Sequence, residues 1–112
     1  MITLKACGNS KTQKLAGAIA ANLREQDEIY ISSVGASALN QAIKSLIVAR
    51  RFLMSDKEKS DLVVQPEFSI QTFDEEQAEG KNREVTAIKL HVKKIPYDPS
   101  VADAFLNAEN NK

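Results

Sequence analysis

The segment VGASALNQAIKSLIVARRFL, residues 34–53, decides the fold that this sequence predicts. It opens on a turn of small residues, namely Gly35, Ala36 and Ser37, and continues as an amphipathic helix. At about 100° per residue, the apolar side chains of this helix fall on one side; they are Leu39, Ala42, Ile43, Leu46, Ala49 and Leu53. A narrow polar stripe lies well away from that side and consists of Asn40, Lys44 and Arg51. The helix therefore packs one side on a core and offers amide and cationic groups for binding on the other.

The residues before this helix predict a strand, a helix and a second strand. Residues 2–6 alternate apolar and polar side chains, and residues 28–33 are rich in β-branched and aromatic residues, so both indicate strands. A helix is expected over residues 11–24, with three large apolar side chains directed toward the core: Leu15, Ile19 and Leu23. The unit that leads into the amphipathic helix is thus strand, helix, strand.

Two details concern how the helix over residues 11–24 begins and packs. Ser10 and Gln13 have the spacing of a capping box, in which the serine oxygen accepts from the backbone three residues on. Gly17 lowers helix propensity by up to about 1 kcal/mol, which suggests that another element approaches closely there. Both details are expectations about the environment of this helix.

The second half of the chain predicts two strands joined by a charged turn. Pro66 interrupts the strand over residues 61–72 and cannot donate a ladder hydrogen bond, which indicates an edge strand or a bulge. A turn is expected over residues 73–83, with Gly80 as its pivot. The strand over residues 84–94 alternates clearly, with Ile88, Leu90 and Val92 facing in and Lys89, His91 and Lys93 facing out.

The element order β-α-β-α-β-β predicts an α/β fold of the α+β two-layer sandwich type. Its mixed four-stranded sheet carries both helices on one face, and the domain covers residues 1–95. Residues 96–112 form a C-terminal extension. Asp98 and Pro99 have the pattern of an N-cap and a first helical residue, so a short helix is expected, with a frayed tail from Asn107.

Length and charge limit the classes of protein that fit. A chain of 112 residues suits one small domain, and its 15 basic and 15 acidic residues balance. The balance hides an asymmetry, because residues 1–53 carry seven Lys or Arg against three Asp or Glu, while residues 54–83 carry four against eight. The single Cys7 allows no intramolecular disulfide, and there is no segment of signal-peptide or membrane-spanning character. We therefore expect a soluble cytoplasmic protein without a membrane partner.

The order of elements, together with particular residues, resembles the stage V sporulation protein S (SpoVS) family. The likeness rests on AGAIA at residues 16–20, GASALNQAIK at 35–44, IVAR at 47–50 and TAIKLHV at 86–92. It covers roughly residues 1–94. The resemblance implies an Alba-like fold and a nucleic-acid-binding regulator of sporulation. The chain departs from the family pattern in a longer, more acidic hairpin (Asp74, Glu75, Glu76 and Glu79) and in the extension after Ile95.

The resemblance directs attention to basic and amide residues near the helix starts. The helix N-terminus at residues 35–37 suits a phosphate, Asn40 suits a base edge or phosphate, and Lys44 and Arg51 supply charge. A group around the first strand–helix turn extends this surface: Lys5, Asn9, Lys11 and Lys14. The alternative interpretation of both sets is a solvated face that only keeps the helices soluble.

Two further surfaces are open to a functional and a structural interpretation. Alba-like proteins use the last hairpin as an arm, so Lys81 and Arg83 are candidate backbone contacts, although carboxylates in the same loop repel phosphate. The outer sheet face mixes one ring, Tyr30, with cations, which fits either base stacking or an ordinary polar face. The cations are Lys5, Lys89 and Lys93, and His91 lies among them.

The sequence lacks the patterns expected of an enzyme or a metal protein. His91 and Cys7 are the only residues of their kinds, and no ligand spacing, Ser-His-Asp arrangement or phosphate-loop motif is present. We therefore expect a non-enzymatic DNA- or RNA-binding regulator that acts as a homodimer or homotetramer, with no cofactor, metal or small-molecule substrate. The alternative is a protein–protein interaction module without nucleic-acid binding, which the balanced charge and the acidic hairpin favour.

Overall fold

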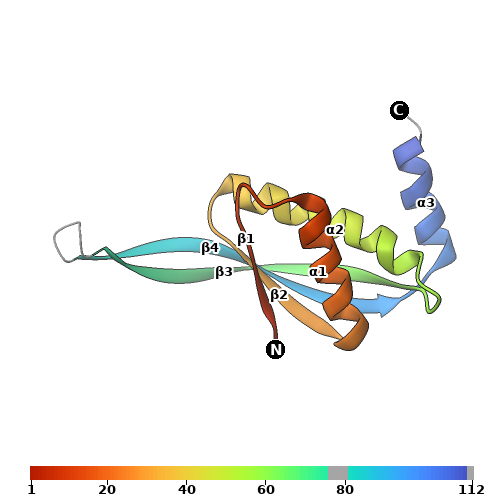
Figure 1. Cartoon of the computed structure of the whole chain (residues 1–112), viewed down its shortest axis with the longest axis horizontal. Coiled ribbons are helices and arrows are strands. Elements are labelled where there is room, and N and C mark those ends of the chain that lie inside the picture. The colour runs from red at the N-terminus through yellow and green to blue at the C-terminus, as the bar shows by residue number, and fades with distance from the viewer. Residues whose placement is uncertain (76–80, 111–112) are drawn as a thin grey trace.

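The computed structural model describes the backbone of residues 1–75 and 81–110 and the side chains of residues 1–70 and 86–108 (Figure 1). Seven elements follow one another: β1 (Thr3–Ala6), α1 (Thr12–Glu25), β2 (Glu28–Ser33), α2 (Ala36–Met54), β3 (Ser60–Glu75), β4 (Lys81–Pro96) and α3 (Pro99–Asn110). The predicted β-α-β-α-β-β order is confirmed, and a third helix follows it.

The four strands form one mixed sheet in the order β1-β2-β4-β3. β1 runs parallel to β2, while the pairs β2–β4 and β3–β4 are antiparallel. β3 lies at the edge of the sheet, opposite β4 only, so Pro66 occupies a strand in which a missing N–H is tolerated. This confirms the edge position that Pro66 predicts.

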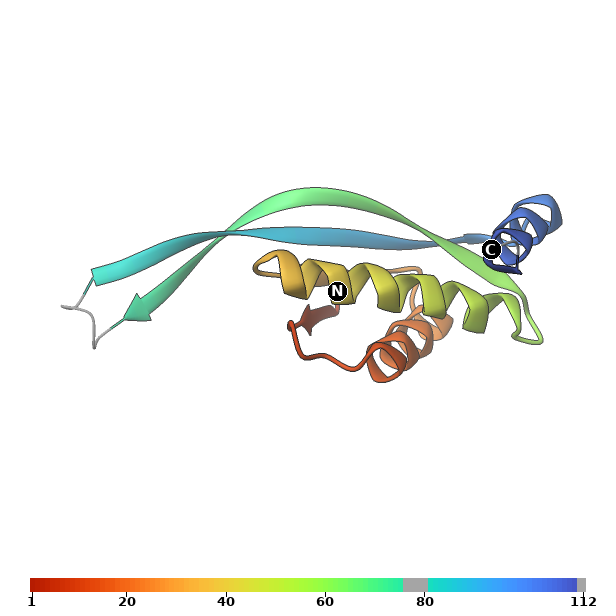
Figure 2. The ribbon, with the colours of Figure 1, turned by 90° about the horizontal axis from the view of Figure 1, so that it is seen from above.

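Helices α1 and α2 lie on the same face of the sheet, and the other face is open (Figure 2). Alternation along the strands explains this arrangement, because Ile29 and Ile31 on β2 and Leu90 and Val92 on β4 are buried against the helices. The helices contribute buried side chains to the same cluster: Ala16, Ile19, Ala20 and Leu23 from α1, and Ala42, Leu46, Ala49 and Leu53 from α2. One contiguous core therefore joins the two layers.

Strands β3 and β4 are longer than the sequence predicts. β2 pairs with β4 only as far as Ile88, whereas β3 follows β4 to the pair Glu75–Lys81. Beyond Ile88 the two strands form a ribbon that projects from the body, which we call the arm (Figure 1). The predicted turn over residues 73–83 is therefore too wide, because β3 continues to Glu75 and β4 begins at Lys81. A two-stranded ribbon can carry charged residues within its hydrogen-bonded ladder, so the polar composition of this segment does not show where the strands end.

Three local expectations for α1 and α2 are wrong. Ser10 does not cap α1, because its hydroxyl accepts from the backbone N–H of Cys7 at 2.9 Å and the N-cap residue makes no side-chain cap. Gly17 meets no close neighbour, because a Cβ added there has no non-local heavy atom within 4 Å. Ile43 is 41% exposed, since it lies at the margin of the apolar side of α2 and not at its centre.

The extension forms a longer helix than expected. Asp98 Oδ1 accepts from the backbone N–H of Ser100 at 3.0 Å and from its hydroxyl at 2.8 Å, and Pro99 is the first helical residue, so the predicted start is confirmed. α3 continues past Asn107 to Asn110, and fraying of this tail stays a prediction. Within the described part of the chain, no helix has both the length and the apolar character needed to cross a membrane.

Candidate nucleic-acid interface

The start of α2 lacks a side-chain cap. Its N-cap residue is Gly35, at φ 89° and ψ 159°, and no side chain bonds the first backbone N–H groups. A residue with a Cβ is strained at this φ, which explains the glycine. The first turn contains no acidic residue, and Ala36 and Ser37 are exposed. The partial positive charge of the helix start therefore faces solvent without a carboxylate to neutralise it.

The loop between β1 and α1 packs against this first turn. A Cβ added to Gly8 would lie 2.7 Å from Oγ of Ser37, so any other residue here requires the serine side chain or the loop to shift. The amide Nε2 of Gln41 donates to the carbonyl oxygen of Ser10 and holds the loop beside α2. Sequence reasoning missed Gly8, Ser37 and Gln41 in this role; the only available signal was a glycine directly between a strand and a helix.

Five of the predicted binding residues are exposed on the loop, on the start of α1 and on the first half of α2: Asn9, Lys11, Lys14, Asn40 and Lys44. We call these five the loop–helix surface. Among the described residues, no carboxylate pairs with its three lysines, and the first turn of α1 also carries no acid. The three acidic residues of the first half, Glu25, Asp27 and Glu28, follow the C-terminal end of α1. The surface therefore combines cations with an uncapped helix start, which suits phosphate oxygens.

The structure separates the other predicted residues from this surface. Lys5 points to the open face of the sheet, because Leu4 and Ala6 on the same strand contact the core. Arg51 continues the stripe of α2 in its last turn, seven residues beyond Lys44, which corresponds to about 10 Å along the helix. Lys81 and Arg83 belong to β4 in the arm, and their side chains lie outside the described residues.

Apolar side chains at the base of the arm border the start of α2. Phe68 is 81% exposed and Ile70 is 70% exposed, although both lie on the side of β3 that faces the core at Leu62. A hollow of about 330 Å³ lies between the arm and the helix start, lined by Ser33, Gly35, Ala36, Leu39, Phe68, Thr86 and Ile88. The helices end before they cover this part of the ribbon, which is why its apolar side remains in solvent.

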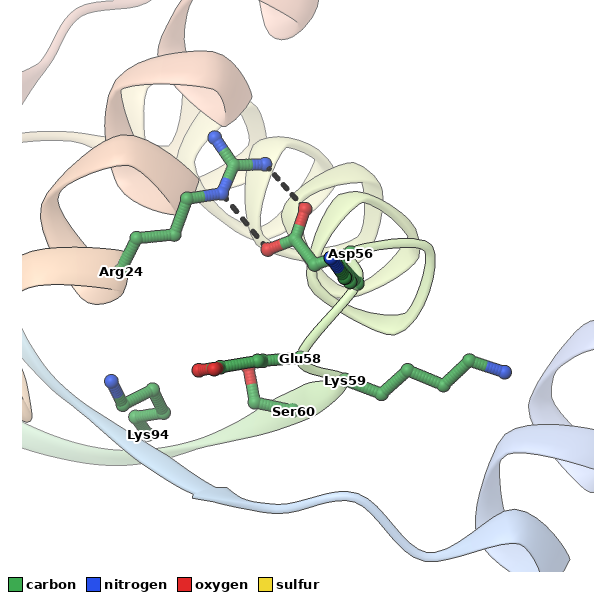
Figure 3. A pocket seen from close by; sticks show the side chains of 7 residues that line it. Arg24, Asp56, Glu58, Lys59, Ser60 and Lys94 are labelled. Carbon is green, nitrogen blue, oxygen red and sulfur yellow. Dashed lines mark hydrogen bonds and ion pairs between the residues drawn. The ribbon is translucent and has the colours of Figure 1, made fainter.

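At the opposite end of α2, the charges are paired. Arg24 on α1 donates to both carboxylate oxygens of Asp56, at 2.9 and 3.0 Å, on one side of a polar hollow (Figure 3). These hydrogen bonds raise the pKa of the Arg24 guanidinium. Lys94 lies 3.9 Å from Asp27, and Lys59 points away from both cations toward α3. Because carboxylates already compensate Arg24 and Lys94, this hollow is a poorer phosphate site than the loop–helix surface.

A more buried ion pair joins α2, β3 and α3. Arg50 donates to both oxygens of Asp61, at 2.8 and 3.0 Å, and its guanidinium lies 4.2 Å from the ring centre of Phe105. The hydrogen bonds to Asp61 raise the pKa of Arg50, while burial opposes that rise. Asp61 is 3% exposed and also accepts from the backbone N–H of Leu62. This pair is structural, because its carboxylate is enclosed.

An apolar groove lies beside that ion pair. Four of its lining side chains are each about two-fifths exposed: Ile43 at 41%, Ile47 at 39%, Val63 at 43% and Val101 at 45%. They come from α2, β3 and α3, so the C-terminal extension widens the groove. Within residues 1–75 and 81–110, no cluster of three His, Cys, Asp or Glu side chains is arranged to hold a metal ion.

Two comparisons with known proteins bear on this architecture. The family model for Stage V sporulation protein S (SpoVS) matches residues 2–95. The structure of Alba from Thermoplasma volcanium is similar with a TM-score of 0.57 at 14% sequence identity, covering 81% of this chain and 98% of that chain. At this identity the similarity concerns the fold, and it confirms the Alba-like arrangement. The family match ends at Ile95 and leaves α3 outside it.

Proposed function

The chain belongs to the stage V sporulation protein S family, and from that premise we propose that it is a non-enzymatic, nucleic-acid-binding regulatory protein. The loop–helix surface is its phosphate-binding region. The observation that carries the proposal is the uncapped start of α2, together with three exposed lysines on α2 and around the start of α1 that no described carboxylate neutralises.

Each part of the surface has a distinct task in this proposal. The first N–H groups of α2 donate to a phosphate oxygen, and the helix dipole favours the negative charge. Lys11, Lys14 and Lys44 add Coulombic attraction to neighbouring phosphates, while Asn40 donates to a backbone or base oxygen. Contacts of this kind recognise the backbone and carry little base specificity.

Fluorescence anisotropy with duplex DNA, duplex RNA and the corresponding single strands tests the proposal. Affinity for duplex DNA should fall steeply between about 50 and 200 mM salt, with a slope of about −0.9 for each phosphate contacted. The Lys44→Glu variant should weaken duplex binding about tenfold or more and reduce the slope by about one or two units.

Lys57→Glu is the matched control, because Lys57 is also exposed but lies in the turn after α2, at the paired end. It changes the net charge equally and should leave affinity close to that of the unmodified protein. Equal losses in the two variants would indicate attraction by net charge alone and would remove the loop–helix surface from the proposal.

The apolar groove supports a homodimer or homotetramer. Four side chains that are each about two-fifths exposed line this groove, and exposed apolar patches can mark interaction sites between proteins. A second copy that covers this groove would place two loop–helix surfaces in one particle and raise the apparent affinity for a continuous backbone. Sedimentation of the full chain, compared with an Ile47→Glu variant, tests this arrangement.

The same groove also favours the second candidate function, a protein–protein interaction module without nucleic-acid binding. In that case a different protein occupies the groove, and the lysines only maintain solubility. Absence of binding to all four nucleic acids at about 50 mM salt, combined with a monomeric native chain, would favour this alternative.

A further inference from the structure

The open face of the sheet carries an aromatic pair at its centre. Tyr30 on β2 and His91 on β4 are direct partners in the antiparallel register, and their ring centroids lie 4.5 Å apart with an interplanar angle of 32°. Thr3 and Gln65 continue the same row on the two outer strands. Both rings face away from α1 and α2, because Ile29, Ile31, Leu90 and Val92 occupy the helix side. The rings therefore lie in the middle of a sheet surface that no element of the described fold covers.

Lysines surround this aromatic pair. Lys89 places its Nζ over the Tyr30 ring, 4.1 Å from the ring centre, which shows that this ring face is accessible from the solvent side. Lys5 and Lys93 lie on neighbouring rows of the same face. Glu28 and Glu67 are the carboxylates of these rows, so the lysines exceed the acids by one. The face is mildly cationic and offers rings, hydroxyls and amides.

The His91 ring is incompletely bonded. Its Nε2 is the buried side-chain nitrogen without a hydrogen-bond partner among the described residues, and it lies 3.4 Å from Oε1 of Glu28 in a geometry that makes no hydrogen bond. Because this nitrogen is enclosed, it gains a partner only if the ring turns toward the surface when a ligand binds.

From this arrangement we infer that the open sheet face binds single-stranded nucleic acid by stacking an unpaired base on the Tyr30–His91 pair. Stacking of a base on an aromatic ring is generally stronger than an exposed lysine–ring contact, so a base displaces Lys89 from the ring. The displaced Lys89, together with Lys5 or Lys93, then contacts the adjacent phosphates. Duplex nucleic acid is excluded from this site, because its bases are already stacked and paired.

The composition of the face argues against a second protein copy as its occupant. Val63, on the edge strand, is the exposed large apolar side chain among the rows on either side of Tyr30, and the groove that it borders gathers the other such residues, Ile43, Ile47 and Val101. A homo-oligomer interface draws its stability from a continuous apolar centre, which this face lacks. Rings within a polar, mildly cationic surface suit a nucleotide chain better.

The site is separate from the loop–helix surface, and its binding has a different signature. Only about two phosphates are contacted beside the stacked base, so the salt slope of this site should be about −0.7 for each of them, smaller than the slope of duplex binding. The steep salt dependence proposed for duplex binding belongs to the lysines of α1 and α2. The two surfaces can therefore be tested independently.

The chain offers an internal reporter for this inference. It contains two tyrosines and no tryptophan, so Tyr97→Phe leaves Tyr30 as the sole source of tyrosine emission. Titration of this variant with a thymidine oligonucleotide of about 12 nucleotides should quench the emission as a base stacks on the ring. Emission that stays unquenched at saturating oligonucleotide, or absence of single-strand binding at about 50 mM salt, overturns the inference.

Substitutions of Tyr30 provide the second arm of the test. Tyr30→Leu should lower single-strand affinity roughly tenfold or more, while Tyr30→Phe, which keeps the ring, should retain it. Duplex affinity should be unchanged in both, and circular dichroism confirms that each variant is folded. Equal single-strand affinity in the Leu and Phe variants contradicts the inference. Lys44→Glu separates the two proposals, because it should leave Tyr30 quenching intact whether or not duplex binding is lost.

Discussion

The two ends of α2 differ in whether their charges are paired. At the amino end, Gly35 starts the helix without a side-chain cap, and neither Lys11 in the adjoining loop nor Lys44 midway along the helix has a carboxylate partner among the described residues. At the carboxyl end, Arg50 forms a two-bond ion pair with Asp61, and Arg24 does the same with Asp56. The protein thus uses Arg24 and Arg50 for internal structure at the carboxyl end and leaves Lys11 and Lys44 available elsewhere.

This difference assigns stability and binding to different ends of one helix. Arginine presents a planar fork that matches a carboxylate with two hydrogen bonds, so it suits the fixed pairs of the carboxyl end. Lysine is a flexible point charge, which suits attraction to a phosphate chain without base specificity. Changes at the carboxyl end should therefore alter the free energy of unfolding, and changes at the amino end should alter binding.

The largest effect should come from the buried pair of the carboxyl end. Arg50→Met removes the partner of a carboxylate that is only 3% exposed, and the uncompensated charge should lower the free energy of unfolding by about 3–5 kcal/mol. Urea unfolding followed by circular dichroism measures this loss. The double variant Arg50→Met/Asp61→Asn should recover a large part of it, because neither charge then remains.

Arg24→Met is the matched control for this prediction. Its side chain is 47% exposed and that of Asp56 is 24% exposed, so loss of this pair should lower the free energy of unfolding by at most about 1 kcal/mol. Equal losses in the Arg50 and Arg24 variants would mean that burial does not distinguish the two pairs.

Local patterns in the sequence predicted most of the fold. The 3.6-residue periodicity of α1 and α2 and the alternation of β2 and β4 identify the faces that are buried, and Pro66 predicts the edge position of β3. The ends of β3 and β4 were not predictable in this way. Their length depends on pairing between residues far apart in the chain, and the polar composition of the segment suggested a turn.

The candidate site was predictable only in part. Charge and exposure identified Lys11, Lys14 and Lys44, because a lysine on the polar side of a helix is exposed in almost any arrangement. The contact of Gly8 with Ser37 could not be predicted, because it depends on the distance between two elements, which sequence patterns do not give. Lys5 was predicted both for this surface and for the outer sheet face, and the structure places it on the sheet face, because alternation along a strand and not nearness in the chain determines the direction of its side chain.

The next effect concerns the contact that holds the amino end together. Gly8→Ala places a Cβ 2.7 Å from Oγ and 3.1 Å from Cβ of Ser37, so the serine hydroxyl must rotate away and the loop must shift slightly from the first turn of α2. The free energy of unfolding should fall by about 1–3 kcal/mol, as for other overpacked contacts. Duplex affinity should fall as well, because Asn9 and Lys11 move away from α2. Urea unfolding and anisotropy on the same variant measure both effects.

Gly17→Ala is the control, since the added methyl group meets open space inside a helix. It should raise the free energy of unfolding by up to about 1 kcal/mol through helix propensity. Adding Ser37→Ala to Gly8→Ala removes the closest atom and should restore part of the stability. A Gly8→Ala variant as stable as the unmodified protein would show that the loop is free to move away from α2 without loss.

The smallest effect concerns the start of α3, where the contrast with α2 is sharpest, because a side chain caps this helix. The hydroxyl of Ser100 and then its backbone N–H bond the Asp98 carboxylate and lower its pKa. The folded pKa is depressed, so the cap contributes stability above the ordinary aspartate pKa and loses it as the pH falls through the folded value. In an NMR titration of the side-chain carboxyl, Ser100→Ala should shift the Asp98 pKa upward toward its ordinary value.

Because Asp98 is exposed, global stability should hardly change and the effect should stay within the first turn of α3. An unchanged Asp98 pKa in that variant would mean that the cap does not persist in solution, and the start of α3 would then resemble the uncapped start of α2.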